Sequence, residues 1–168
     1  MSGTLLQEYE IMLNVGLGAE TLAAYANSFE SAKHDAAHPI TLWHLATVFP
    51  LVFNQVSRRA ISKRQPRSGL RSILTRDPGN DIAQNEPIFN LGARLQAMYP
   101  RTARSLNCAL TWGLLKIHNG VILPSEMRLQ SNLAGEAQEI INAARKLGTW
   151  AGELSAFEYF AILGIRLI

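Results

Sequence analysis

Apolar residues recur at helical spacing along most of the chain, which predicts a mainly α-helical protein. The spacing predicts one helix over residues 1–13 and a second over 19–33, with a break between them at Gly16 and Gly18. Residues 40–60 are apolar around most of a helix circumference, so we expect this segment to be almost completely buried. A proline inside it is expected to kink the helix or to end its first half.

The order of elements in the second half predicts a DNA-binding type of module. Residues 86–99 and 101–115 carry apolar residues at 3.6 spacing, and Pro100 separates the two predicted helices. Asn-Gly at 119–120 follows between two short β-favouring stretches, and this dipeptide is typical of a two-residue type I′ hairpin. Helix, tight break, helix and hairpin are typical of a winged helix-turn-helix, which we place at residues 86–124.

The last third of the sequence returns to the helical pattern. Residues 133–147 have an apolar stripe that predicts a long helix, and Gly148 and Gly152 are expected to loosen its end. The tetrapeptide SAFE at 155–158 has the pattern of a capping box that opens a last helix. We therefore expect one mostly helical domain over 1–168 that contains a winged helix-turn-helix-like module with one short β-hairpin.

The composition narrows the class of protein. Apolar residues make up 48% of the 168 residues, which excludes a disordered chain. The single cysteine, Cys108, excludes an internal disulfide and indicates a reducing compartment. The longest apolar run, 40–53, is too short and too interrupted to span a bilayer, and the N-terminus lacks the pattern of a secretion signal. We expect a cytoplasmic protein with no membrane segment.

The charge is distributed unevenly along the chain. Residues 1–57 carry a net charge of −4, residues 58–116 carry +8, and residues 117–168 carry −1. Within the basic middle part, the strip 58–76 (RRAISKRQPRSGLRSILTR) holds seven Arg or Lys residues and no Asp or Glu. Its excess of Arg favours bidentate contacts with carboxylates or phosphates. The strip is therefore interpreted as a contact for nucleic acid or for an acidic protein surface, with a solvated face as the alternative.

Ten basic residues are the candidate contacts with a protein partner or with double-stranded DNA. Seven come from the strip: Arg58, Arg59, Lys63, Arg64, Arg67, Arg71 and Arg76. Three come from the predicted recognition helix and wing: Arg101, Arg104 and Lys116. Basic residues at the start of a recognition helix suit DNA reading, but the same helix is strongly apolar, as expected for docking on protein. The module alone leaves both partners open.

Motifs that would indicate catalysis are absent: the chain has no P-loop, no Gly-x-Ser-x-Gly, no Cys-x-x-Cys and no His-Glu-x-x-His. Glu30, His34 and His38 are spaced by four residues and would share one helix face, as some metal ligands do, with ordinary solvent-facing residues as the alternative. Cys108 is interpreted as a small residue on a packed helix. We predict no catalytic residue, no metal ligand and no cofactor.

Three stretches of the sequence resemble one known family. They are PITLWHLATVFPLVFNQVSRRAI (39–61), YPRTARSLNCALTWGLLKI (99–117) and ARKLGTWAGELSAFEYFAILGIRL (144–167). In this order they resemble the middle component of ABC-three-component systems, the group that includes the Lamassu anti-phage defence systems. The last stretch, with its LG-x-W and ILGIR elements, is the most specific of the three.

The resemblance implies a function but no catalytic residues. Middle components accompany an SMC-like (Rad50-like) ABC ATPase and a separate effector, often a nuclease. The resemblance therefore implies that this chain is a non-catalytic adaptor. Such an adaptor would link the ATPase to the effector and couple DNA sensing to release or activation of the effector. The alternatives are a free-standing winged-helix transcription regulator, which would bind DNA as a dimer, and a small metal-dependent hydrolase.

Overall fold

The protein is described by a computed structural model that covers residues 2–34, 38–75, 86–126 and 133–166, with side chains described from residue 15 onward. Within these ranges the prediction of a mainly helical protein with one β-hairpin is confirmed. The elements are α1 (Ser2–Ala32), α2 (Leu42–Val52), α3 (Gln55–Lys63), the 3₁₀ helices η1 (Pro66–Ser68), η2 (Leu70–Leu74) and η3 (Glu86–Ile88), α4 (Leu91–Thr111), β1 (Leu115–His118), β2 (Val121–Pro124), α5 (Glu136–Glu153) and α6 (Ala156–Ile162). None of the described helices combines the length and the apolar composition that crossing a bilayer requires.

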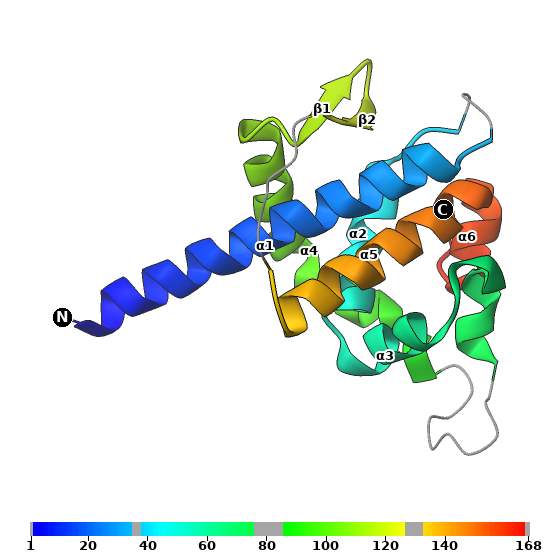
Figure 1. The fold of residues 1–168 in the computed structure, drawn as a ribbon, viewed down its shortest axis with the longest axis horizontal. Coiled ribbons are helices and arrows are strands. Elements are labelled where there is room, and N and C mark those ends of the chain that lie inside the picture. The colour runs from blue at the N-terminus through cyan, green and yellow to red at the C-terminus, as the bar shows by residue number, and fades with distance from the viewer. Residues whose placement is uncertain (1, 35–37, 76–85, 127–132, 167–168) are drawn as a thin grey trace.

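Helices α1 and α5 lie side by side in parallel and form the centre of the molecule (Figure 1). Two glycines of α5 make this close approach possible. A Cβ atom at Gly148 would lie 2.2 Å from the carbonyl oxygen of Tyr25, and one at Gly152 would lie 2.5 Å from that of Phe29. The prediction that these glycines loosen the end of the helix is wrong: both lie inside α5, where they let two backbones touch.

The predicted break at Gly16 and Gly18 is also wrong, because α1 continues through both residues. Helix α4 crosses α1 here. A Cβ atom at Gly18 would lie 2.1 Å from the Oγ atom of Ser105 and 2.9 Å from the ring of Phe49. The glycines therefore form a notch that admits α2 and α4. This packing outweighs the low helix propensity of glycine, which costs about 1 kcal/mol per residue relative to alanine.

The apolar segment 40–60 is two helices rather than one. Helix α2 is buried from His44 onward, as expected, and keeps Pro50 inside it. The chain turns after α2, and the side chain of Asn54 caps α3 by accepting a hydrogen bond from the Ser57 N–H at 3.0 Å. This turn directs the basic strip away from the buried helix that precedes it.

The structure does not confirm the winged helix-turn-helix at 86–124. Pro100 lies inside α4, so most of the predicted helices 86–99 and 101–115 forms one continuous helix, Leu91–Thr111, without a turn at the proline. The hairpin is confirmed: β1 and β2 pair antiparallel around Asn119 (φ 51°) and Gly120 (φ 75°), the two positive φ values that a type I′ turn requires.

The last helix begins as the sequence predicts. Ser155 and Glu158 form the expected capping box, in which each side chain bonds to the backbone N–H of the other residue. Helix α6 then places Tyr159 and Phe160 in the core beside His44. The described part of the C-terminal tail, through Arg166, forms no strand.

Candidate interaction surface

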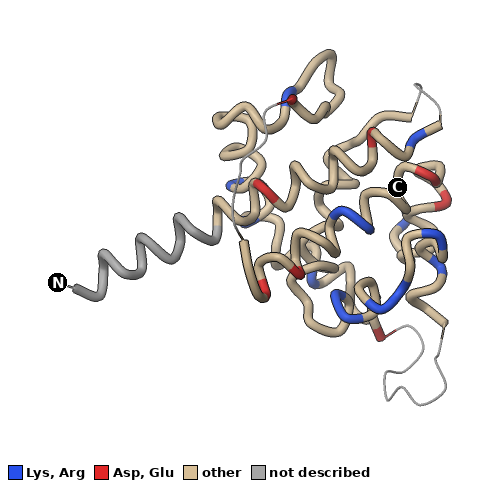
Figure 2. The backbone as a smooth tube through the Cα atoms, viewed as in Figure 1, with Lys and Arg blue, Asp and Glu red and all other residues tan. Residues whose placement is uncertain are grey.

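The basic strip forms α3, η1 and η2, where Arg and Lys residues gather on one part of the molecule (Figure 2). Its backbone is fixed to α5. The Lys146 ammonium donates hydrogen bonds to the carbonyl oxygens of Ile61 (3.1 Å) and Ser62 (3.0 Å) at the end of α3. The indole N–H of Trp150, a fully buried residue, donates to the Pro66 carbonyl at 2.6 Å. The strip therefore presents its side chains from a rigid base.

Arg58 is used inside the protein rather than on its surface. It is only 5% exposed, and its guanidinium donates to the Val52 carbonyl at 2.9 Å and to Glu136 Oε1 at 2.6 Å. A second carboxylate, that of Glu139, lies 4.0 Å from it. Arg58 thus joins the end of α2 to the start of α5. It is too buried to contact a partner, so its predicted role as a surface contact is wrong.

Replacing Arg58 by alanine is expected to lower the free energy of unfolding by about 1–3 kcal/mol, because the Val52 carbonyl loses its partner in a buried site. Glu136 stays largely exposed, so water can solvate its carboxylate, and this limits the loss. The neighbouring Arg59 is exposed, and Arg59→Ala should change stability by less than about 0.5 kcal/mol. Urea denaturation of the two variants checks this; equal stabilities would contradict it.

Four residues of the strip form an exposed cationic group, which we call the basic surface: Arg59, Lys63, Arg67 and Arg71. Arg64 lies among them, half-buried, and donates to the Thr75 carbonyl at 2.8 Å, which holds the end of η2 close to α3. Arg76, the last residue of the predicted strip, lies outside the described residues.

Among the described residues, the carboxylate of Glu158 interacts with Arg71 of the basic surface. The pKa of Glu158 is lowered, first by the hydrogen bond from the Ser155 backbone, then by the Ser155 hydroxyl, and to a smaller extent by the charge of Arg71. Because the carboxylate of Glu158 is occupied by the cap of α6, it neutralises the basic surface only in part.

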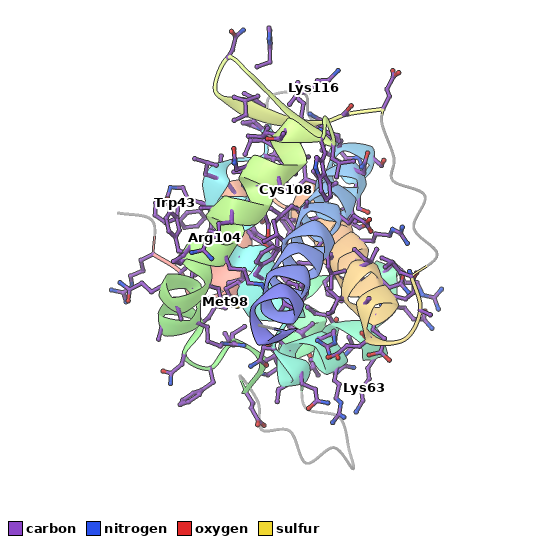
Figure 3. All side chains as sticks on the ribbon, turned by 90° about the vertical axis from the view of Figure 1, so that its left-hand side faces the viewer. Trp43, Lys63, Met98, Arg104, Cys108 and Lys116 are labelled. Carbon is purple, nitrogen blue, oxygen red and sulfur yellow. The ribbon has the colours of Figure 1, made fainter. Side chains whose placement is uncertain are left out.

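The other three predicted contacts lie elsewhere. The Arg101 guanidinium is half-buried 4.2 Å from the centre of the Phe53 ring, and burial lowers its pKa. Arg104 on α4 and Lys116 on β1 are exposed. In Figure 3, Lys63 and Lys116 lie at opposite ends of the molecule, so the ten predicted residues do not form one surface.

Arg94 is an organising residue that the sequence interpretation missed. Its guanidinium donates to the carbonyl oxygens of Pro50 (2.9 Å) and Pro87 (2.8 Å) and to the Ser57 hydroxyl (3.0 Å). Burial lowers its pKa. Its partners come from α2, α3 and η3, so no local pattern around residue 94 could indicate its role.

The metal hypothesis gains no support from the geometry. Glu30 forms an ion pair with Lys33 (2.7 Å), and the His38 ring packs on Phe29 and His44. Among the described residues, no three His, Cys, Asp or Glu side chains lie together as metal ligands would. Burial raises the pKa of Cys108, which favours the neutral thiol over a reactive thiolate.

A groove of about 620 Å³ is lined mainly by residues of α1 and α5. Its lining includes Glu20 and Glu153 as well as His34 and Arg145, so charges of both signs face it. No local sequence pattern indicates this groove, because it depends on the close approach of helices that are distant in the chain. Its mixed charge favours no class of ligand.

Comparison with known families places this chain in one of them. A family model described as ABC-three component (ABC-3C) system Middle Component 3 matches residues 2–167, nearly the whole chain. The chain belongs to this family. Searches of curated proteins and of solved structures gave no significant match. As a Middle Component 3 protein, the chain has the other components of its ABC system as partners.

Proposed function

We propose that this Middle Component 3 protein is a non-catalytic adaptor in an anti-phage defence complex of the Lamassu type. It links an SMC-like ABC ATPase to an effector, often a nuclease in such systems, and couples the sensing of DNA to release or activation of the effector. The family assignment supports a place among other components. The observation that carries the proposal is the basic surface on α3, η1 and η2.

The basic surface has the properties of a contact for an anionic partner. Its four cations are exposed, while the backbone that carries them is anchored by Lys146 and Trp150 of α5. Anchoring reduces the conformational entropy that binding would otherwise cost. The strip 58–76 contains no Asp or Glu of its own, so carboxylates or phosphates of a partner would reduce the mutual repulsion of its exposed cations.

The test is co-purification with the ATPase and effector encoded beside this chain. Changing Arg59, Arg67 and Arg71 together to Glu should weaken retention of one component at least tenfold at 0.15 M salt, because several charge-assisted contacts become repulsive. A variant with Lys116 and Arg145 changed to Glu is the matched control, since both residues are exposed and distant from η1 and η2 along the chain. It should retain both components.

Two results would overturn the adaptor proposal. In the first, the unaltered chain retains neither component. In the second, it binds short duplex DNA alone, with an affinity that falls steeply as salt rises, which is the behaviour of a free-standing regulator. If the triple variant retains both components, the basic surface is a solvated face and the adaptor proposal loses the observation that carries it.

A further inference from the structure

The hairpin of β1 and β2 stands at the end of α4 and has two outer edges (Figure 1). Beside β2, the chain itself supplies an extended residue. Ile40 pairs antiparallel with Ile122, whose N–H donates to the Ile40 carbonyl at 3.5 Å. Beside β1, no described residue other than those of β2 is paired in this way. Among the described residues, the hairpin therefore has one covered edge and one open edge.

The hydrogen-bond register of the hairpin determines which backbone groups face the open edge. Antiparallel strands alternate between residue pairs that bond to each other and pairs whose N–H and C=O groups point outward. The Ser125 N–H donates to the Leu114 carbonyl at 3.0 Å, so this pair bonds inward. Ile122, three residues earlier, points outward to Ile40, which agrees with the alternation. Ile117 is the cross-strand partner of Ile122 and therefore directs its own N–H and C=O away from β2.

The exposure of the side chains indicates the same open position. Cross-strand partners point to the same face of a sheet, so the side chains of Ile117 and Ile122 are neighbours. Ile122 is 2% exposed and Ile40 beside it is fully buried, whereas Ile117 is 53% exposed. An exposed apolar side chain and outward backbone groups thus occur at one residue, although each alone is ordinary.

We propose that the open edge of β1 binds an extended segment of another component of the system, which adds a strand beside Ile117. The inference rests on the adaptor function and names the conformation and chemistry of one partner segment. Its backbone would bond to the N–H and C=O of Ile117, and an apolar residue would cover the Ile117 side chain. Lys116 and His118 are exposed on the opposite face, so the neighbours of that apolar residue stay in water. The segment therefore alternates between apolar and polar residues.

A second copy of this chain fits the open edge less well, because its β1 is short. Antiparallel pairing centred on Ile117 would extend no further than the turn of the second copy, where Asn119 has a φ of 51°. Antiparallel pairing centred on Lys116 would place this residue directly opposite the same lysine of the second copy, and like charges in that position repel. A separate extended segment meets neither obstacle.

The test uses the co-expressed complex of ATPase, effector and this chain. Ile117→Pro removes the outward N–H, which the hairpin does not use, and should weaken the retention of one component about tenfold. Ile117→Val is the matched control, because valine keeps the N–H and most of the apolar side chain. It should retain both components.

Two further measurements do not depend on how the proline variant folds. In the unaltered chain, the Ile117 amide should exchange its hydrogen about a hundredfold more slowly in the complex than in isolation, because a partner strand accepts its N–H. A photoreactive phenylalanine derivative in place of Ile117 should crosslink to the bound segment, which mass spectrometry then identifies.

Protection of the Ile117 amide in the complex and a crosslink to a segment of alternating apolar and polar residues would support the proposal. Equal exchange with and without the other components would overturn it, as would full retention of both components by Ile117→Pro. A crosslink to DNA, to a second copy of this chain or to a segment without the alternation would also overturn it. Failure of the unaltered chain to retain any component would instead overturn the adaptor function, and the inference with it. The two failures are thus distinguishable.

Discussion

Gly148→Ala is expected to lower the free energy of unfolding by about 3 kcal/mol. The new Cβ atom would meet the Tyr25 carbonyl oxygen at 2.2 Å, and no side chain can move away to relieve the contact because the obstacle is backbone. Helices α1 and α5 would have to separate, which disturbs the buried side chains between them. Thermal and urea denaturation measure the loss.

A second glycine supplies the control. Gly92 lies on the exposed side of α4, and a Cβ atom there meets nothing within 4 Å. Gly92→Ala should therefore stabilise the protein slightly, by up to about 1 kcal/mol, because alanine favours the helix. If Gly148→Ala were as stable as Gly92→Ala, the close approach of α1 and α5 would be disproved.

Acid should destabilise the protein through His44 by about 2 kcal/mol between pH 7 and pH 5. Burial, and to a smaller extent the nearby His38, lowers the pKa of His44 from about 6.5 to about 4. Between about pH 6.5 and pH 4, His44 is therefore protonated in the unfolded chain but remains neutral in the folded chain. The stability that the neutral ring provides is complete above pH 6.5 and is lost as the pH falls toward 4.

The variant His44→Gln tests whether His44 causes this dependence of stability on pH. His44 accepts the Thr41 backbone N–H at 3.1 Å through Nδ1, and glutamine is the usual residue at this position of a capping box. The variant should keep the cap and lose most of the dependence of stability on pH between 7 and 5. His118→Gln, which alters an exposed histidine, should keep it. An unchanged pH dependence in His44→Gln would contradict the assignment.

The elements predicted correctly from the sequence are those that neighbouring residues determine. Asn119 and Gly120 fix the hairpin, because their positive φ values suit these two residues, and Ser155 with Glu158 fixes the start of α6. The helical stripe of α5 was also clear from its spacing. Each of these signals depends on residues within a few positions of one another.

The predictions that were wrong concern residues whose role depends on contacts with distant segments of the chain. Glycine next to the start of a helix suggests a break, yet Gly18 is required by Ser105, which lies far along the chain. Pro100 suggests a boundary, but α4 continues through it and the helix-turn-helix is not confirmed. Arg58 was assigned to the outer surface because its acidic partner, Glu136, belongs to α5. Local charge could not reveal that pairing.

The pairing of α1 with α5 also sets the order in which the chain matures during synthesis. Tyr25 and Gly148 are more than a hundred residues apart, so the ribosome needs on the order of ten seconds to add α5 after α1 has emerged. Throughout that interval the apolar side of α1, with Leu22, Tyr25 and Phe29, has no α5 to cover it. We therefore expect chaperones to bind the nascent chain in this state, and a product truncated before α5 to aggregate.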